Sequence, residues 1–336
     1  MDYIEWSDDV QDVITGDLTA AVAYGTPAAG AVAAAVSPIG LVDRGARTVG
    51  FTTSLGLAKK LNHILQNRRL AMCYHTRTHG LSTSSSLILI QGLASVDLTP
   101  SAQRLDDLME RQTRYLGQFP GGPVWDWLLR EYQRERVFVD IHVQRIMAWH
   151  DLSGVGATSI VGLSAPQPPQ SQAEPANGTG PRVNVAKVGK SLEKLPHRLL
   201  AFRGSDGYPV IVPVTPTGTD RDGIRIQAPS GLLPQGVRRA GWLAHRYNAQ
   251  CVGLSVQMCT GWLEVSGDTG RYAPHTVRTL TAPSNRTAQA LGNGILTKYG
   301  HWQAARRGTL DTLASLATLT SDSVAGQDKT TEPPSP

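Results

Sequence analysis

The residues best suited to chemistry lie within residues 48–74, TVGFTTSLGLAKKLNHILQNRRLAMCY. The first residues are typical of a strand, and residues 57–67 have the apolar spacing of an amphipathic helix. Hydroxyl and ammonium groups stand where the strand passes into the helix, at Thr52, Thr53, Ser54, Lys59 and Lys60. A phosphate dianion is held by such donors, by free N–H groups at a helix start and by compensating positive charge. The turn therefore predicts a phosphate site; the alternative is a solvated lysine pair on a helix face.

Other motifs in the chain do not complete a site. Residues 188–191, VGKS, have the end of a phosphate-binding loop, but Asn184 stands where that loop needs its first glycine. His75 and His79 have neither a helix nor a third ligand, so we predict no metal site there. Three further histidines stand alone in the sequence, His197, His245 and His275. We interpret these as structural residues, and the alternative is a catalytic or haem-ligand role for one of them.

Cysteines and large aromatic residues lie in apolar runs. The cysteines, which we interpret as buried thiols in a reducing compartment, are Cys73, Cys251 and Cys259. The aromatic residues predicted to lie in the core are Trp149, Trp242, Trp262, Tyr247 and Tyr272. The alternative is that those in the second half form the floor of a flat substrate pocket.

Short strands and glycine-rich turns surround the basic turn and recur in the second half of the chain. Residues 25–27 correspond to 206–209, residues 42–45 to 219–223, and residues 90–96 to 259–265. Two hairpins, one short helix and a further antiparallel pair in each half are typical of small barrels. Because the features recur in the same order, they predict an internal repeat.

Composition divides the chain between these halves. Residues 164–182 are rich in Pro, Gln, Ser, Ala and Gly, a composition that does not support a packed core. We predict a first barrel with the basic turn over residues 1–163 and a flexible linker over 164–182. A second, diverged barrel with a C-terminal helix follows over 183–318, and a disordered tail over 319–336.

Taken together, the motifs of the first half resemble the pyridoxamine-5'-phosphate-oxidase-like split barrels, which bind FMN or a deazaflavin. The family has a Gly-x-Pro hairpin, a strand ending in a hydroxyl pair, a basic helix start, Asn-Pro-Arg, and a Gly-x-Ala-x-Val strand. The matching positions are Gly25-Thr26-Pro27, Thr52-Thr53, Lys59-Lys60, Asn67-Arg68-Arg69 and Gly92-Leu93-Ala94-Ser95-Val96. The resemblance covers roughly residues 15–150.

This resemblance implies a mainly β fold with α: two tandem split β-barrels, six-stranded and Greek-key-like, with peripheral helices. It implies that Thr53 and Ser54 donate to the cofactor phosphate. Lys59 or Lys60 supplies the counter-charge, since counting forward from Thr53 favours Lys59 and counting back from Asn67 favours Lys60. The cofactor that the resemblance implies is FMN, with a deazaflavin as the alternative and haem as a further one.

The resemblance also implies where the flavin ring lies and where the sequence departs from the family. Val36, Ser37 and Pro38 are candidates for the wall beside the ring. Arg68 stands where the family has proline, which weakens the helix stop. In the second half, residues 224–227 are followed by Ala228-Pro229-Ser230-Gly231, with no lysine at the corresponding helix start, so we expect one cofactor site per chain, in the first half.

The function that the resemblance implies is that of a flavin-dependent oxidoreductase, which transfers a hydride between the cofactor and a small organic substrate. The alternative is a non-catalytic flavin- or haem-binding, sensing protein of the same fold. Barrels of this family pair as homodimers, and a tandem chain could make that pairing internally.

Charge and hydropathy limit the partners. The net charge is +5 and no basic run exceeds two residues, so we expect no nucleic acid partner. No apolar run approaches the roughly 20 residues that a membrane span needs, so we expect no membrane partner. The first residues are acidic, unlike a signal peptide, and we expect a cytoplasmic protein that acts on a small molecule.

Overall fold

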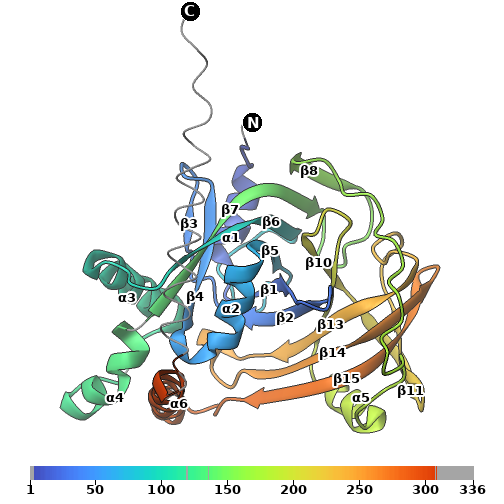
Figure 1. Cartoon of the computed structure of the whole chain (residues 1–336). Coiled ribbons are helices and arrows are strands. Elements are labelled where there is room, and N and C mark those ends of the chain that lie inside the picture. The colour runs from blue at the N-terminus through green and yellow to red at the C-terminus, as the bar shows by residue number, and fades with distance from the viewer. Residues whose placement is uncertain (1–3, 119, 135, 307, 309–336) are drawn as a thin grey trace, which may run out of the picture.

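The structure is a computed structural model that describes residues 4–118, 120–134, 136–306 and 308. The tail predicted over residues 319–336 lies outside the described residues. Strands form two antiparallel sheets, and helices lie at their periphery (Figure 1).

The first sheet is built from eight strands of the first half. They are β1 (Ala20–Gly25), β2 (Ala31–Val36), β3 (Val42–Asp43), β4 (Thr48–Ser54), β5 (Arg69–Tyr74), β6 (Leu87–Asp97), β7 (Arg136–Trp149) and β8 (Thr158–Gly162). Neighbouring strands follow the order β2-β1-β5-β6-β7-β4-β3, and β8 pairs with β7.

The second sheet has seven strands in an order that matches the first. They are β9 (His197–Arg203), β10 (Pro209–Pro213), β11 (Thr215–Asp220), β12 (Gly223–Gln227), β13 (Gly236–Arg246), β14 (Ser255–Ser266) and β15 (Thr269–Thr281). The order β10-β9-β13-β14-β15-β12-β11 is that of the first sheet with every label shifted by eight. Of the segments that the sequence marks as a repeat, residues 42–45 and 90–96 are in register with 219–223 and 259–265, whereas residues 25–27 and 206–209 lie at opposite ends of the equivalent hairpin turns.

Six helices and two short 3-10 turns connect the described strands. The helices are α1 (Asp8–Gly16), α2 (Ala58–Gln66), α3 (Ala102–Leu116), α4 (Pro123–Arg134), α5 (Val185–Glu193) and α6 (Arg286–Arg306). The turns are η1 (Leu55–Leu57), before α2, and η2 (Ala249–Cys251). Ser101 caps α3, because its hydroxyl accepts from the Arg104 N–H. No described helix has the length and hydropathy of a membrane span.

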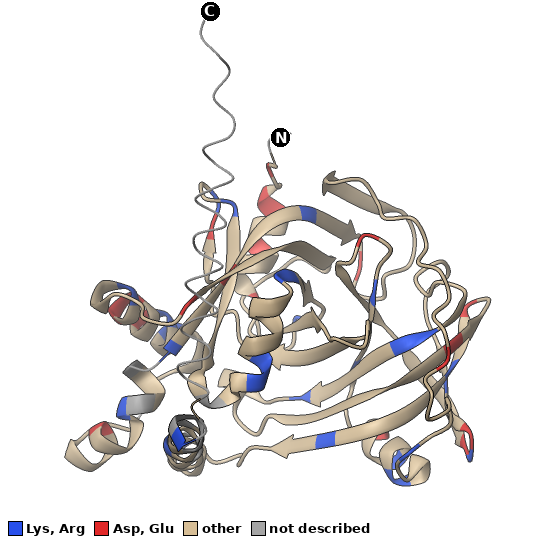
Figure 2. Ribbon diagram, in the orientation of Figure 1, with Lys and Arg blue, Asp and Glu red and all other residues tan. Residues whose placement is uncertain are grey.

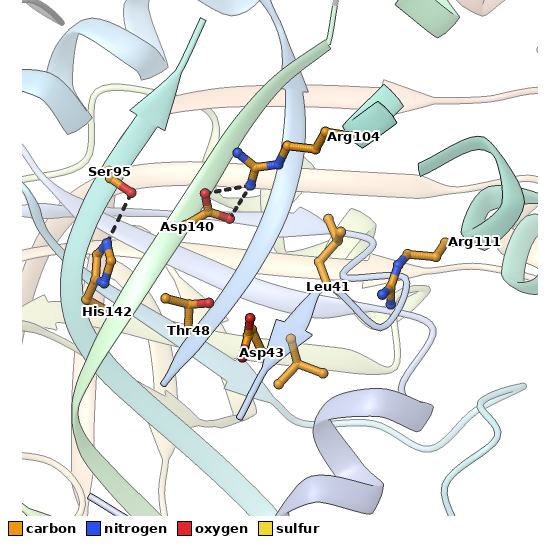
Figure 3. A pocket seen from close by; sticks show the side chains of 9 residues that line it. Leu41, Asp43, Thr48, Ser95, Arg104, Arg111, Asp140 and His142 are labelled. Carbon is orange, nitrogen blue, oxygen red and sulfur yellow. Dashed lines mark hydrogen bonds and ion pairs between the residues drawn. The ribbon is translucent and has the colours of Figure 1, made fainter. Parts of the chain in front are cut away.

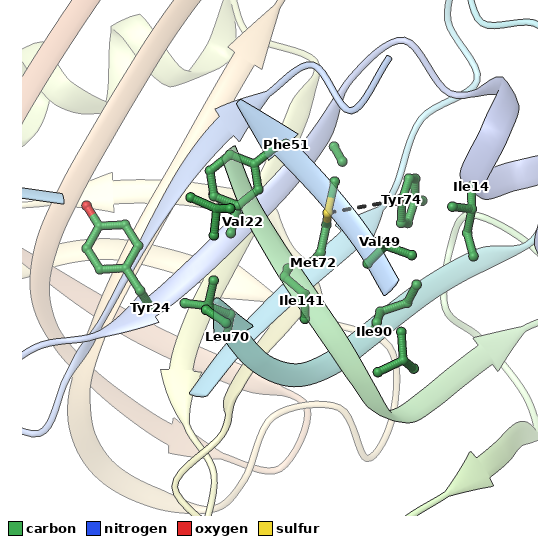
Figure 4. Packing of buried hydrophobic residues seen from close by; sticks show 14 of the residues in the cluster. Ile14, Val22, Tyr24, Val49, Phe51, Leu70, Met72, Tyr74, Ile90 and Ile141 are labelled. Carbon is green, nitrogen blue, oxygen red and sulfur yellow. Dashed lines mark hydrogen bonds between the residues drawn. The ribbon is translucent and has the colours of Figure 1, made fainter. Parts of the chain in front are cut away.

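Each sheet has its own apolar core. In the first, Val49 and Phe51 of β4 face Leu70 and Met72 of β5, and Tyr24 lies at the edge of the cluster (Figure 4). The aromatic residues assigned to the core are buried, as are the cysteines: Trp149, Trp242, Trp262, Tyr247, Tyr272, Cys73, Cys251 and Cys259. The core interpretation of these aromatic residues and thiols is confirmed.

A further apolar cluster joins the two sheets within one chain. From the first sheet it contains Ala31 and Ala33 of β2, and from the second it contains Ile211, Leu243 and Val256. A side chain at Gly241 on β13 would come within 2.5 Å of the Ala31 carbonyl oxygen. Small residues are therefore needed where β2 crosses the second sheet.

The predicted fold class is confirmed: the chain is mainly β, with two antiparallel sheets and peripheral helices. The sheets have eight and seven strands rather than six, because the short hairpin strands β3 and β11 extend the edges and β8 pairs with β7. Among the described strands neither sheet is closed by pairing between its two end strands.

Residues 164–182, which connect the sheets, contain neither helix nor strand. The Gln172 N–H donates to the Val237 carbonyl, and the Gln172 side-chain amide donates to the Ala29 carbonyl of the first sheet's hairpin. Ser171 accepts from the Val237 N–H. The segment is held against both sheets at these points, while the flexibility and the domain boundaries stay predictions.

Candidate cofactor-binding site

The turn predicted to hold a phosphate lies where β4 passes through η1 into α2. Strand β4 ends at Ser54, and α2 begins at Ala58 with Leu57 before it. Leu57 makes no side-chain cap, and the first turn of α2 has no acidic residue. The N–H groups at this helix start therefore present their positive end without a side-chain acceptor.

Thr53 carries the most informative hydroxyl of the turn. Its side chain is 3% exposed and lies on the same face of β4 as Val49 and Phe51. Among the described residues its Oγ1 has no hydrogen-bond partner. Because a buried hydroxyl without a partner costs free energy, this atom is suited to a ligand oxygen. Thr52 and Ser54, its neighbours, are half-buried.

The two lysines differ in their surroundings. Lys60 is half-buried, and its ammonium lies 5.0 Å from the centroid of the Phe51 ring. Burial, and then the charge of Arg136, lower the pKa of Lys60 to about 8. Lys59 is exposed. Lys60 is therefore the lysine that lies beside the core of β4.

Arg136 is a third cation at the turn, and the sequence analysis missed it. It is the first residue of β7 and pairs with Ser54 in the register of β4 and β7. Its Nε is buried and has no hydrogen-bond partner among the described residues, and its guanidinium lies 4.2 Å from the Tyr132 ring centroid. The signal that could have found it is the alternating apolar pattern of residues 137–143, which is typical of a strand that could pair with the strand carrying the hydroxyls.

The basic turn continues along α2 toward the second sheet. His63 stacks on Tyr24 at the end of β1, with ring centroids 6.1 Å apart. Burial raises the pKa of Tyr24 to about 12, and the charge of Arg278 on β15 acts against this rise. Figure 2 shows basic positions on both α2 and β15. Cations from both sheets therefore lie near this side of α2.

The predicted ring wall lies at the end of β2. Val36 packs against the first core, and Pro38 is buried. The Ser37 hydroxyl lies 3.2 Å from the Cys251 sulfur in η2. The Gln289 amide of α6 donates to the Cys251 carbonyl, and α6 also packs against η1. The wall residues and the basic turn are thus linked through the start of α6, although no described contact joins them directly.

The second sheet lacks the equivalent donors. Aligning the registers on Gly92 and Gly261 places Ala228 where the first sheet has Thr53, and Pro229 where it has Ser54. Gly267 then stands in the place of Arg136. The second-half arginine Arg238 is 1% exposed and donates to the carbonyls of Pro169, Pro234 and Gln235, so its role is structural.

The side chains on the strands that face the opposite sheet also differ in size between the two halves. The face of β2 carries Ala31, Ala33 and Ala35, and the equivalent positions of β10 are Pro209, Ile211 and Pro213. Beside β10, polar groups of the first sheet fill the junction: Gln91 donates to the Pro209 carbonyl at 2.6 Å, and Arg145 is paired with Asp206 at 2.8 Å.

The residues equivalent to Gln91 and Arg145 are Thr260 and Thr276. Their hydroxyls bond to each other at 2.6 Å and reach no residue of the first sheet. Side chains are therefore smaller, and cross-sheet bonds fewer, on the side of the molecule that carries the basic turn.

Two of the three histidines that stand alone in the sequence, His197 and His245, meet His75 at the junction of the sheets, while the third, His275, lies beside the Thr179 carbonyl. His75 and His245 hold equivalent positions at the ends of β5 and β13, and their Nε2 atoms are 2.7 Å apart. Burial lowers the pKa of His75 to about 3 and that of His245 well below its usual value. His197 lies beside them, with its ring centroid 5.1 Å from that of His245. The described residues form no group arranged to hold a metal ion.

A pocket of about 240 Å³ lies elsewhere, on the outer face of the first sheet (Figure 3). Arg104 in its wall is held by Asp97 and Asp140, and the Ser95 hydroxyl lies 3.3 Å from Nε2 of His142. None of the residues predicted to bind the cofactor lines this pocket.

Comparison with known proteins gives distant similarities only. No family model and no curated protein matches the chain. A haem-binding protein from Mycobacterium smegmatis aligns over 88% of this chain and 100% of its own, at 11% identity and a TM-score of 0.30. A pyridoxamine 5'-phosphate oxidase-related, FMN-binding protein from Nostoc punctiforme aligns over 59% and 87%, at 11% identity and 0.28. An FAD-binding protein from Mesorhizobium loti aligns over 44% and 95%, at 12% identity and 0.29. TM-scores this low carry no argument about the chain.

Proposed function

We propose that this chain is a flavin-dependent oxidoreductase that binds one FMN, or one deazaflavin, per chain. The phosphate of the cofactor would lie at the turn between β4 and α2, and the substrate would be a small organic molecule. The observation that carries the proposal is the turn itself, where the buried Thr53 hydroxyl has no described partner and the charge of Arg136 acts on the ammonium of Lys60. Two of these residues have buried polar atoms without partners among the described residues, as a missing anion would leave them.

Each of these residues has a defined part in holding a phosphate. The Thr53 hydroxyl would donate a hydrogen bond, and Lys60 and Arg136 would neutralise the charge of the dianion. The positive end of the α2 dipole would add to the attraction of the anion at this turn. Of the two lysines that the sequence left open, we assign the phosphate to Lys60, because Lys59 is exposed.

The flavin, when bound, supplies the ring that accepts or donates the hydride. The chain's own residues would position that ring and exclude water from it. Ala33 and Ala35 on β2 are smaller than Ile211 and Pro213, which hold the equivalent positions in the second sheet. This difference supports a single cofactor site, in the first sheet.

Flavin binding without turnover is the second candidate. It is supported by the turn itself, where the described residues offer hydroxyl and cationic groups but no carboxylate that could act as a base. A haem is less well supported, because His245 is fully buried and bonded to His75. An axial bond from His245 would require this pair to separate.

The proposal is tested by titrating FMN into the protein and following the quenching of flavin fluorescence. Thr53→Val keeps the shape of the side chain and removes the hydroxyl, and Lys60→Met removes the charge. We expect each to raise the Kd roughly 10- to 100-fold, as hydrogen bonds to charged groups contribute about 1.5–3 kcal/mol. Lys59→Met is the matched control and should change the Kd much less. Equal effects of Lys59→Met and Lys60→Met would contradict the assignment.

Turnover is tested separately on the FMN-loaded protein. Loss of visible flavin absorbance after anaerobic addition of NADH or NADPH, and its return with an electron acceptor, would support an oxidoreductase. A loaded protein whose spectrum stays unchanged with these donors would favour the non-catalytic alternative.

A further inference from the structure

Helix α6 is packed with its small residues inward and its large apolar residues outward. Ala290 is 1% exposed, and a side chain at Gly294 would meet Leu128 of α4 at 2.7 Å. The large residues Leu291, Ile295, Tyr299 and Trp302 are 45–56% exposed. Their spacing of four, four and three places them on one side of the helix. The side of α6 that would normally form a core therefore faces outward.

Helix α4 packs beside α6 and extends this apolar surface. Val124 and Trp127 of α4 are 74% and 60% exposed. The Lys298 ammonium of α6 lies 4.3 Å from the centroid of the Trp127 ring. We call these six apolar side chains, four on α6 and two on α4, the α4–α6 face. Exposed apolar surfaces of this kind mark interaction sites.

The described charges beside the α4–α6 face are the cations Lys298, Arg306 and Arg130 and one exposed carboxylate, Asp126 of α4, while Arg286 donates to Gln250 at the start of α6. The sequence of α6 contains Arg286, Lys298 and Arg306 and no acidic residue. Arg130 of α4 is exposed nearby. Figure 2 shows basic positions on both helices. The partner that complements this surface is therefore apolar at its centre and negatively charged.

We propose that the α4–α6 face binds the surface of a membrane that contains anionic lipid. Tryptophan and tyrosine beside lysine and arginine are the residues with which helices lie in the interface of a bilayer. Pairing with a second copy is disfavoured, because it would bring the cations of two such faces together.

The sequence-based expectation of no membrane partner rests on the lack of a long apolar run. That lack bears on spanning a bilayer and not on binding at its surface. The proposed membrane contact is independent of the proposed cofactor.

The test is co-sedimentation of the full chain with vesicles of phosphatidylcholine, with or without phosphatidylglycerol. We expect binding only to the vesicles with phosphatidylglycerol, and weaker binding at high salt. The charge variant Lys298→Glu with Arg306→Glu should lower binding by at least about 30-fold, the loss for two basic residues at an anionic surface. Trp127→Ser with Trp302→Ser should also release the protein.

The matched control is Val155→Ser with Leu163→Ser, which removes two exposed apolar side chains outside the two helices. This control should bind like the unchanged protein, and circular dichroism should show that every variant is folded. Absence of binding, or binding that the α4–α6 variants leave unchanged, would overturn the proposal. Sedimentation equilibrium that reveals a dimer lost in the tryptophan variant would also overturn it, in favour of a second copy.

Discussion

A lysine that has lost part of its hydration responds to anions and to pH more strongly than an exposed one. Burial and Arg136 lower the pKa of Lys60 to about 8, so free protein loses this charge above pH 8. A bound phosphate dianion would hold the proton on Lys60. FMN binding should therefore weaken above pH 8, by up to about tenfold per pH unit, in fluorescence titrations.

Lys60→Arg is the matched control for this pH dependence, because a guanidinium stays charged throughout the range. The variant should bind FMN with an affinity that changes little between pH 7 and pH 9. If the FMN affinity of the protein without the substitution also changed little between pH 7 and pH 9, Lys60 would not contact the phosphate.

Local spacing was sufficient to predict part of the candidate site. Thr53 and Lys60 are close in sequence, and a strand followed by a helix brings them to one turn. Arg136 could not be found in this way, because its place depends on the pairing of β4 with β7. The small side chains on β2, and the threonines that replace Gln91 and Arg145 in the second sheet, can likewise be recognised only after the two sheets are aligned.

At the scale of elements, one glycine of each long central strand lies opposite a bulge that bends its partner strand, at Gln144 of β7 and His275 of β15. The register of β6 shifts at Gly92 and that of β14 at Gly261. A Cβ at Gly92 would lie 2.2 Å from the His142 carbonyl oxygen, and one at Gly261 would lie 2.2 Å from the Ala273 oxygen. Gly92→Ala and Gly261→Ala should each lower the free energy of unfolding by about 1–3 kcal/mol, measured in urea.

Gly292→Ala in α6 is the control, since a Cβ there meets nothing within 4 Å. It should leave stability unchanged or raise it by about 0.5–1 kcal/mol. If Gly92→Ala were as mild as this control, the strand bend would not depend on glycine.

Elements were easier to predict than their arrangement. The helix expected over residues 57–67 is α2, because its apolar spacing is local. Glycine disfavours a helix, yet α6 runs unbroken through Gly292, Gly294 and Gly300. Gly294 is needed there for close packing on Leu128. Helix propensity, which is a local property, does not account for such packing contacts.

At the scale of the whole molecule, two equivalent sheets meet at the His75–His245 pair. Both imidazoles have a lowered pKa because they are buried, so the folded chain holds them neutral while the unfolded chain protonates them below about pH 6.5. The unfolded state therefore binds more protons in acid. The contribution of the pair to the free energy of unfolding should be complete above pH 6.5. It should be lost as the pH falls, by up to about 1.4 kcal/mol per pH unit for each histidine.

Urea unfolding at several pH values, compared with His75→Gln and His245→Gln combined, measures this contribution. Other buried groups titrate as well, Asp17 among them, since burial raises its pKa to about 8. Subtracting the free energy of unfolding of the variant from that of the unchanged protein cancels the contribution of these other groups. A difference that does not shrink between pH 7 and pH 5 would show that the pair is not held neutral.

The two sheets share one strand order, yet only the first carries the hydroxyls, the lysine and the arginine of the basic turn. The most direct test of this account is the number of flavins that one chain binds, measured by equilibrium dialysis with FMN. We predict one FMN per chain, lost in the combined Thr53→Val and Lys60→Met variant. Two FMN per chain, none, or one that this variant retains would contradict the account.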